Sequence, residues 1–273
     1  MTKNLFLIVI LSIIFTGCTT ILKQKPVIIR IKGSDSMLIL NQLWAEEYMK
    51  THPDISIYYS GGGSGEGIKS LIKGTIDICA ASRPIEPDEV KELAENYGTV
   101  GMSFIVAKDA LSIYLNLYNP VSNLTLDQIK KIFTGEIINW KEVGGKDELI
   151  QVIIRPPNSG THLYLKEHVL NGLNYTGKAI VLPTTTSIVY EVSRNENAIG
   201  YGGIAYSNTV VNCMVNSVVP TEENVRNNKY PLSRYFFFYT IDTPTREIKN
   251  FLDWTLSPEG QRIVKNSGYI PLY

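Results

Sequence analysis

The sequence predicts an α/β protein in which mainly parallel β-strands alternate with α-helices. Short apolar runs, which are typical of buried strands, recur along the chain, and residues with helical spacing follow most of them. In three places a turn rich in glycine and serine joins such a strand to the next helix. Alternation of this kind favours sheets flanked by helices. The length of 273 residues allows one large domain or two modest ones.

The expected elements follow one another from Val27 to the C-terminus. Pro87 and Gly98 mark the ends of one helix, since proline favours the first helical position and glycine the position after the last. Thr125 and Gln128 have the spacing of a capping box, so a helix is expected to begin there. Strands are expected at 27–31, 55–59, 76–80, 152–154 and 235–240, with two adjoining apolar runs at 100–107 and 111–117. Further helices are expected at 37–50, 68–72, 162–170, 244–256 and 258–265.

Residues 1–17 are predicted to be a lipoprotein signal peptide, and 18–26 a short polar tether. Lys3 precedes an apolar run, 5–15, that is too short to span a bilayer as a helix. Small residues directly before Cys18 resemble a bacterial lipobox, in which the cysteine is lipidated and becomes the mature N-terminus. We therefore expect a lipid anchor on the cell membrane, facing the periplasm or the cell exterior. A plain secretory signal and an uncleaved anchor are the alternatives.

Charge balance and cysteine content narrow the functional classes. The 26 basic and 26 acidic residues cancel, and no basic run suggests nucleic-acid binding. Any preference for an anion must therefore come from local groups. Cys79 and Cys213 would be able to form a disulfide in an exported protein, but the apolar run around Cys79 favours a buried free thiol.

Three strand–turn–helix segments share a design that suits anions: 33–36, 61–67 and 158–161. The start of a helix offers unpaired backbone N–H groups at the positive end of the helix dipole. Glycine lets an anion approach that backbone, and serine or threonine adds a hydroxyl donor. Each turn alone is explained by ordinary helix capping, whereas three in one chain suggest helix starts that converge on one anion site.

Two arginines stand beside these turns. Arg155 follows the strand 152–154, just before Ser159, and Arg83 follows the strand 76–80. A planar guanidinium group donates two parallel hydrogen bonds, which suits a tetrahedral oxyanion. The alternative for each arginine is a surface charge at the end of a strand.

The most specific stretches are short and occur in a characteristic order. They are GSDSM at 33–37, GSGEGI at 63–68, ASRP at 81–84, IFTG at 132–135, INW at 138–140, RPPNSGT at 155–161, GY at 200–201 and SPEGQ at 257–261. Together they resemble the periplasmic phosphate-binding proteins of ABC transporters, over the chain from about Val27 to Tyr273.

The resemblance implies a two-lobed, type II periplasmic-binding-protein-like fold with crossing strands between the lobes. Inorganic phosphate would lie in the cleft and pass to the permease subunits of an ABC importer, without cofactor, metal or catalytic residue. Lobe 1 is expected at 27–106 plus 234–273, and lobe 2 at 107–233, in a monomer. The residues expected to line the site by position are Asp35, Ser36, Ser64, Arg155, Ser159, Gly160 and Thr161, and Arg83 is added as a further phosphate-binding residue, beside Asp35.

One position departs from the family pattern. Many members have an aspartate after Ala-Ser in the turn of the third strand, where this chain has Arg83. Asp35 instead stands where those members carry a threonine. We expect Asp35 to accept the phosphate proton and Arg83 to keep Asp35 ionised. The alternative is that Asp35 only caps the helix that starts at Met37.

An enzyme is not expected. The stretch from Gly172 to Lys178 matches a P-loop pattern, but Ala179 stands where serine or threonine should ligate magnesium. The three histidines do not pair at metal-ligand spacing. Two alternatives keep the same fold: a lipoprotein that binds sulfate, molybdate or tungstate, and a phosphate-sensing or adhesion lipoprotein.

Overall fold

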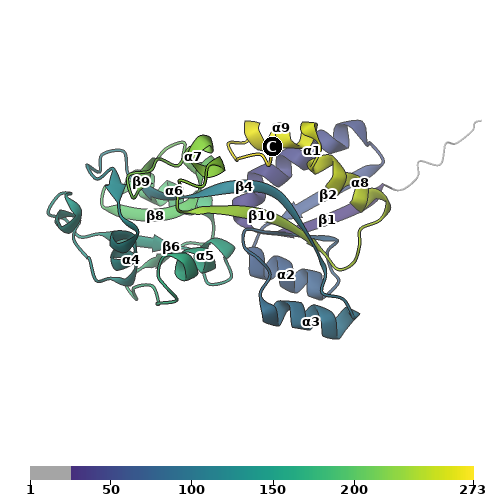
Figure 1. The fold of residues 1–273 in the computed structure, drawn as a ribbon, viewed down its shortest axis with the longest axis horizontal. Helices are drawn as coiled ribbons and strands as arrows, with labels where there is room; N and C mark the ends of the chain where they lie inside the picture. The colour runs from purple at the N-terminus through teal and green to yellow at the C-terminus, as the bar shows by residue number, and fades with distance from the viewer. Residues whose placement is uncertain (1–25) are drawn as a thin grey trace, which may run out of the picture.

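One curled, mixed β-sheet runs the length of the molecule (Figure 1). The computed structural model describes residues 26–273. Within this part of the chain the strand order is β2-β1-β3-β10-β4-β8-β6-β7, with β9 beside β4 and β5 beside β9. The strands are β1 (Val27–Gly33), β2 (Ile55–Ser60), β3 (Ile78–Ala81), β4 (Met102–Leu115), β5 (Asn123–Leu124), β6 (Gln151–Ile154), β7 (Ile180–Val181), β8 (Ala198–Gly203), β9 (Val211–Val215) and β10 (Ser233–Thr240).

Helices cover both faces of the sheet. In Figure 1, α1, α8 and α9 lie above the strands of one half, and α2 and α3 lie below them. The helices are α1 (Leu38–Thr51), α2 (Ser64–Ile72), α3 (Pro87–Tyr97), α4 (Leu126–Thr134), α5 (Gly160–His168), α6 (Thr185–Arg194), α7 (Glu222–Arg226), α8 (Arg246–Thr255) and α9 (Pro258–Asn266). Three 3-10 turns, η1 (Asp35–Met37), η2 (Trp140–Val143) and η3 (Ile204–Tyr206), complete the described elements.

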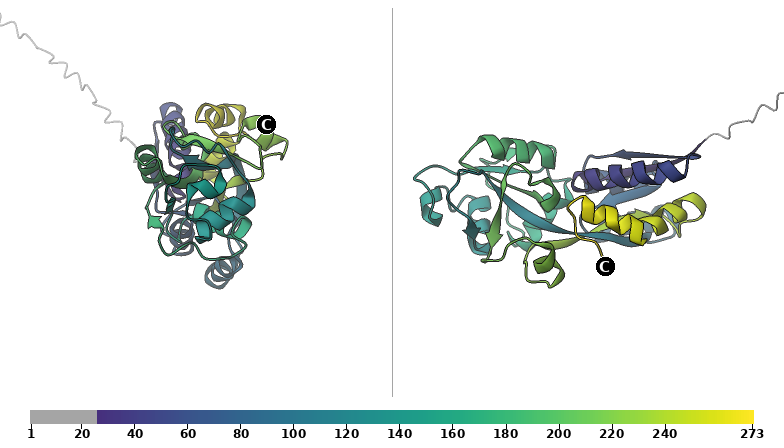
Figure 2. Two further views of the ribbon diagram at one scale, coloured as in Figure 1. Left: turned by 90° about the vertical axis from the view of Figure 1, so that its left-hand side faces the viewer. Right: turned by 90° about the horizontal axis from the view of Figure 1, so that it is seen from above.

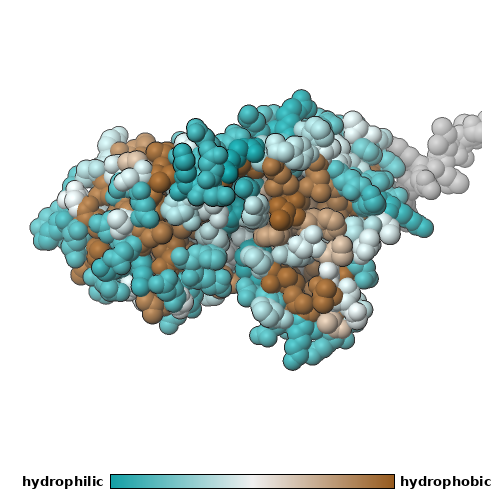
Figure 3. All heavy atoms as spheres, viewed as in Figure 1, coloured by the Kyte–Doolittle hydropathy of each residue, from teal (hydrophilic) through white to brown (hydrophobic). Residues whose placement is uncertain are grey.

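The strands β4 and β10 connect the two halves. β4 pairs with β10 over Met102–Ala110 and with β8 over Leu111–Leu115. The two apolar runs that the sequence separates are therefore one continuous strand. Figure 3 shows apolar patches on both halves of this face, with more hydrophilic residues where the halves meet.

The packing of α1 shows why its residues form a helix. Leu40, Trp44 and Tyr48 are spaced four apart, so they share one face, and all three are buried. The indole N–H of Trp44 donates to the carbonyl of Gly260 in α9 at 2.9 Å, and its ring lies 5.6 Å from that of Phe238. Figure 2 shows α1 and α9 side by side. The helices before and after the connecting strands thus pack on the same half of the sheet.

The α/β class and the sheet flanked by helices are confirmed. Pairs β1–β2, β1–β3, β6–β7 and β6–β8 are parallel, as the alternation of strands and helices predicts. The connecting strands add antiparallel pairs, β10 with β3 and β4, and β4 with β8 and β9. The sequence does not predict β5, β7, β8, β9, α6 or α7, most of which are short.

The predicted lobe boundaries stay predictions. The boundary at 106/107 falls within β4, and the boundary at 233/234 falls at the start of β10. Both are strands that connect the halves, so the boundaries are compatible with the observed connections.

The predicted signal peptide and the lipidation site Cys18 lie outside the described residues. Across residues 26–273, none of the helices has the length and apolar character needed to cross a membrane. Cys79 in β3 and Cys213 in β9 are both buried free thiols.

Candidate functional site

Tyrosines hold the first polar turn, Ser34–Ser36, at the end of β1. Its three consecutive carbonyl groups each accept a hydrogen bond from a phenol. Tyr59 donates to the carbonyl of Ser34 at 2.5 Å, and Tyr206 donates to that of Asp35 at 2.7 Å. Tyr269 donates to the carbonyl of Ser36. Burial raises the pKa of all three phenols, so they remain protonated donors. Because a trans peptide N–H points opposite to the preceding C=O, the N–H groups of Asp35 and Ser36 point away from the tyrosines.

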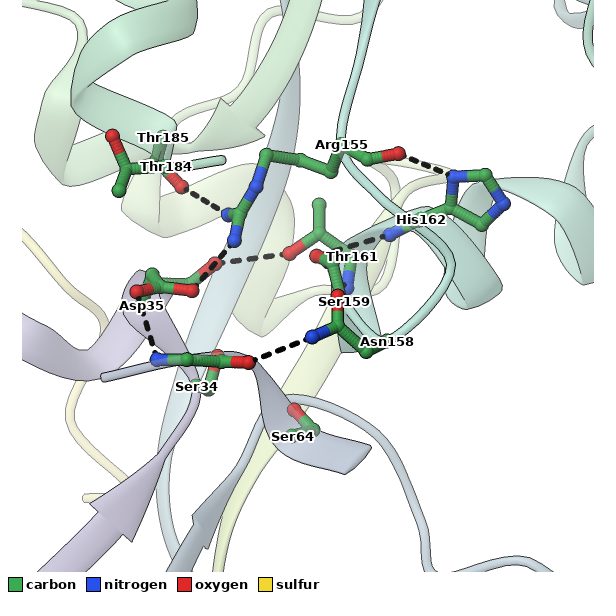
Figure 4. A network of polar contacts seen from close by, with 12 residues as sticks. Ser34, Asp35, Ser64, Arg155, Asn158, Ser159, Thr161, His162, Thr184 and Thr185 are labelled. Carbon is green, nitrogen blue, oxygen red and sulfur yellow. Dashed lines mark hydrogen bonds and ion pairs between the residues drawn. The ribbon is translucent and has the colours of Figure 1, made fainter. Parts of the chain in front are cut away.

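A buried ion pair joins this turn to the segment after β6. Asp35 Oδ2 accepts a hydrogen bond from Arg155 Nη2 at 2.6 Å, and the two residues are 9% and 2% exposed (Figure 4). Asp35 Oδ1 accepts the backbone N–H of Gly62 at 3.2 Å, in the turn before α2. No side-chain capping bond reaches α1 from Asp35 or its neighbours. The alternative that Asp35 only caps the following helix is therefore wrong.

The backbone of Arg155 is held at both of its polar groups. Its N–H donates to the hydroxyl of Tyr201 at 3.1 Å, and its carbonyl lies 2.7 Å from His162 Nδ1. A carbonyl only accepts, so Nδ1 carries the hydrogen. Burial lowers the pKa of His162, although the hydrogen bond to Arg155 opposes this, so the ring stays neutral near pH 7. The neutral imidazole thus acts as a structural donor.

The guanidinium group of Arg155 is only partly satisfied by protein atoms. Besides Asp35, it donates from Nη1 to Thr185 Oγ1 at 3.1 Å, at the start of α6. Its Nε is buried and has no hydrogen-bond partner among the described residues. Buried donors are nearly always paired, so the Nε–H of Arg155, beside Asp35 and the polar turns, is available to an acceptor that binds in the site.

Hydroxyl groups from three turns gather around this pair. Ser36 Oγ lies 2.9 Å from Thr161 Oγ1, which links η1 to the start of α5. Ser159 caps α5, because its Oγ accepts the N–H groups of Thr161 and His162 at 3.2 and 3.4 Å. On the other side, the hydroxyl of Ser64 lies 3.3 Å from that of Ser82, which also accepts from Ser34 at 2.9 Å.

Asn158 braces the glycine-rich turn against α5. Its carbonyl accepts the N–H of Gly65 at 3.1 Å, and its side-chain amide donates to the carbonyl of Gly62 at 3.0 Å. The three polar turns that the sequence singles out therefore meet at one place, as Figure 4 shows for their labelled residues.

The expectation that Arg83 pairs with Asp35 is wrong. Arg83 points its guanidinium at Glu89 in α3, with hydrogen bonds of 2.8 Å from Nη1 to Oε2 and 2.7 Å from Nη2 to Oε1. Nη1 also donates to the carbonyl of Pro84 at 2.7 Å. A bidentate carboxylate outcompetes more distant partners for a guanidinium group. Arg155 supplies the positive charge beside Asp35 instead.

Several residues of the site are absent from the sequence predictions. Arg234 of β10 and Asp109 of β4 form a second buried ion pair, with Nη2 and Oδ2 2.8 Å apart. Thr185 and Tyr206 come from α6 and η3, which the sequence does not predict. The spacing of Thr184 and Ser187, which form a capping box at α6, is a local signal by which the sequence could have marked the start of this helix.

Comparison with known proteins places the chain in a family. Residues 22–259 match the model of the PBP superfamily domain. Phosphate-binding protein PstS of Bacillus subtilis is 33% identical, with 89% of this chain and 80% of PstS covered. A phosphate ABC transporter substrate-binding protein of Clostridium perfringens, solved with bound phosphate, is 35% identical with a TM-score of 0.84, and covers 90% of this chain and 100% of its own. The chain belongs to the family of phosphate ABC transporter substrate-binding proteins.

Another solved member of the family agrees with this assignment. The ABC-type phosphate transport receptor of Vibrio cholerae is 32% identical with a TM-score of 0.73, and the match covers 89% of this chain and 99% of that one. The resemblance seen in the sequence motifs is confirmed, and with it a binding protein rather than an enzyme.

The close approach of α5 to the serines generates a prediction. A Cβ added to Gly160 would lie 2.5 Å from Ser64 Oγ and 2.7 Å from Ser82 Oγ, which are held by other hydrogen bonds. We expect Gly160→Ala to lower the free energy of unfolding by about 1–3 kcal/mol through overpacking, measured by urea denaturation. Gly177→Ala is the matched control, since nothing lies within 4 Å of its added Cβ. Equal stability of both variants would mean that α5 and the serines separate without cost.

Proposed function

We propose that this protein captures inorganic phosphate between its two halves and delivers it to an ABC importer. The observation that carries the proposal is Arg155, a 2% exposed arginine that is ion-paired with Asp35 and whose Nε–H has no partner within residues 26–273. Donor hydroxyls and helix starts surround it. A phosphate ion offers both acceptor oxygens for these donors and, near neutral pH, a proton for the carboxylate.

We assign the contacts with phosphate to the residues that meet in the site. Arg155 donates charge-assisted hydrogen bonds, and the hydroxyls of Ser36, Ser64 and Thr161 donate neutral ones. The starts of α2 and α5 add their dipoles and N–H groups. The full proposed set is Asp35, Ser36, Ser64, Arg155, Ser159, Gly160 and Thr161, without Arg83.

Hydrogen bonds of this kind are sufficient for tight binding. A micromolar dissociation constant corresponds to about 8 kcal/mol. Hydrogen bonds to a charged group contribute about 1.5–3 kcal/mol each. Several such bonds therefore supply this binding free energy and offset the cost of removing phosphate from water. Closure of the two halves around the ion would exclude water and strengthen each bond.

Asp35 is the group that favours phosphate over sulfate. Its carboxylate only accepts hydrogen bonds, and one of its oxygens accepts from Arg155 Nη2 at 2.6 Å. Phosphate near neutral pH retains a proton that it donates to such an acceptor, whereas sulfate has none. A sulfate oxygen facing Asp35 would meet repulsion and an unmade hydrogen bond in a dry site. We therefore expect sulfate, molybdate and tungstate to bind more weakly than phosphate.

The role of Asp35 is tested by Asp35→Asn. The amide keeps an acceptor oxygen but replaces the second with a donor, so we expect phosphate affinity to fall by about tenfold or more, or about 1.4 kcal/mol, and discrimination against sulfate to narrow. Calorimetric titration of wild type and variant with both anions measures this. Asp54→Asn, at an exposed position of the same half, is the control. If Asp35→Asn binds phosphate normally and still excludes sulfate, the selectivity lies elsewhere.

We also propose that Cys18 carries a lipid that holds the protein on the membrane surface. The proposal rests on the short apolar run and the small residues before Cys18. The described body begins at Pro26, so a short segment would separate it from the lipid. Cells labelled with a fatty-acid analogue should label the wild-type protein and not Cys18→Ala. Equal labelling of the two proteins, or none of the wild type, would refute the anchor.

A further inference from the structure

A second buried ion pair lies directly behind the proposed phosphate contacts. Arg234 of β10 and Asp109 of β4 are 5% and 0% exposed. Arg234 donates to Asp109 Oδ2 from Nε at 2.9 Å and from Nη2 at 2.8 Å. Asp109 Oδ1 accepts the N–H of Ile204 at 3.2 Å. The pair lies on the two strands that connect the halves, so its position is fixed by the strand register Arg234↔Asp109.

Arg234 reaches from this pair to two of the hydroxyls in the site. Its Nη1 donates to Thr161 Oγ1 at 2.9 Å, and its Nη2 donates to Ser36 Oγ at 3.3 Å. Ser36 belongs to η1 and Thr161 to the start of α5, so one guanidinium group spans both sides of the site. The rings of Phe236 and Tyr164 lie 5.4 and 5.9 Å from the guanidinium carbon and limit its movement.

The direction of these hydrogen bonds has a consequence for the hydroxyls. Arginine has no acceptor and stays charged, so Ser36 Oγ and Thr161 Oγ1 must both accept from it. A hydroxyl that already accepts in a fixed direction turns its own hydrogen elsewhere. Ser36 Oγ and Thr161 Oγ1 lie 2.9 Å apart, so one of these hydroxyls donates its hydrogen to the other. When an anion binds, both hydroxyls are able to donate to it.

We propose that Arg234 is a positioning residue that makes Ser36 and Thr161 dedicated hydrogen-bond donors toward phosphate. This inference rests on the proposed function, because it concerns the same site. Arg234 itself is occupied by Asp109 and the two hydroxyls, so it acts through them and not by direct contact. The site thereby presents donors only on this side, which matches the acceptor oxygens of a phosphate ion.

The role of Arg234 also explains why it is paired with Asp109. An unpaired arginine behind the site would add a positive charge and attract any anion. Asp109 neutralises that charge, so Arg234 orients the hydroxyls of Ser36 and Thr161 without attracting anions of every kind to the site. The selectivity of the site among anions then depends on which groups donate and which accept hydrogen bonds.

A double-mutant cycle tests the inference. Removing Arg234 alone would leave Asp109 buried and unpaired, which risks unfolding, so the pair is replaced together as Asp109→Asn with Arg234→Met. We expect this replacement to weaken phosphate binding by about tenfold or more in the wild-type background. In a Ser36→Ala, Thr161→Val background, which lacks both hydroxyls, the same replacement should weaken binding by no more than about twofold, because interacting groups are not additive.

The matched control is the other buried arginine pair, replaced as Glu89→Gln with Arg83→Met. Arg83 is also 5% exposed and bidentate with its carboxylate, but its guanidinium group bonds Glu89 and Pro84 and none of the proposed phosphate contacts, so phosphate affinity should stay unchanged. Thermal melting without phosphate checks that each variant is folded. Equal losses of affinity in the two backgrounds would overturn the role of Arg234 and leave phosphate binding intact. A wild-type protein that gives no heat with phosphate would overturn the proposed function as well.

Discussion

The ion pair between Asp35 and Arg155 is the interaction around which the site is organised. It joins residues 120 positions apart in the chain, and both side chains are almost fully buried. Two charges removed from water are costly unless each finds its partner and further hydrogen bonds. The surrounding structure supplies these, from the N–H of Gly62 for Asp35 and from Thr185 for Arg155.

The fold holds the two partners by separate means. On one side, phenols bond the carbonyls of Ser34–Ser36 and fix the turn that carries Asp35. On the other side, Tyr201 and His162 hold both backbone groups of Arg155. The connecting strands β4 and β10 bring the two sides together and place a second ion pair behind them. Each side of the site is thus held by its own hydrogen bonds, and two strands connect the sides. This arrangement suits a site that must position donors and still admit a ligand.

The sequence predicts the parts of this site that are local in the chain. Arg155 and the turns at 33–36, 61–67 and 158–161 stand out because strand ends, glycines and hydroxyl residues follow one another there. Arg83 also follows a strand and a serine, but its guanidinium group pairs with Glu89 instead of Asp35. Glu89 forms part of the capping box at the start of α3 and accepts hydrogen bonds from the guanidinium group of Arg83. The path of the chain after Pro84 brings these two residues together.

The parts that the sequence misses depend on contacts between distant segments. Arg234 and Asp109 lie inside strands, 125 positions apart, and only the antiparallel register brings them together. Single aromatic residues such as Tyr206 and Tyr269 look like ordinary core residues until the fold shows which carbonyl each one reaches. The α/β class followed from alternation, whereas the antiparallel pairs made by β4 and β10 required knowledge of where the chain crosses between halves.

Calorimetric titration of wild type and Arg155→Lys with phosphate tests whether the guanidinium group of Arg155 binds the anion. Lysine keeps a positive charge beside Asp35 but is a point charge that cannot donate to Asp35, Thr185 and phosphate in one plane. We expect one phosphate to bind per wild-type molecule and the affinity of the variant to be about 10–100-fold lower, or about 1.4–2.8 kcal/mol. Wild-type affinity in a folded Arg155→Lys protein would contradict it.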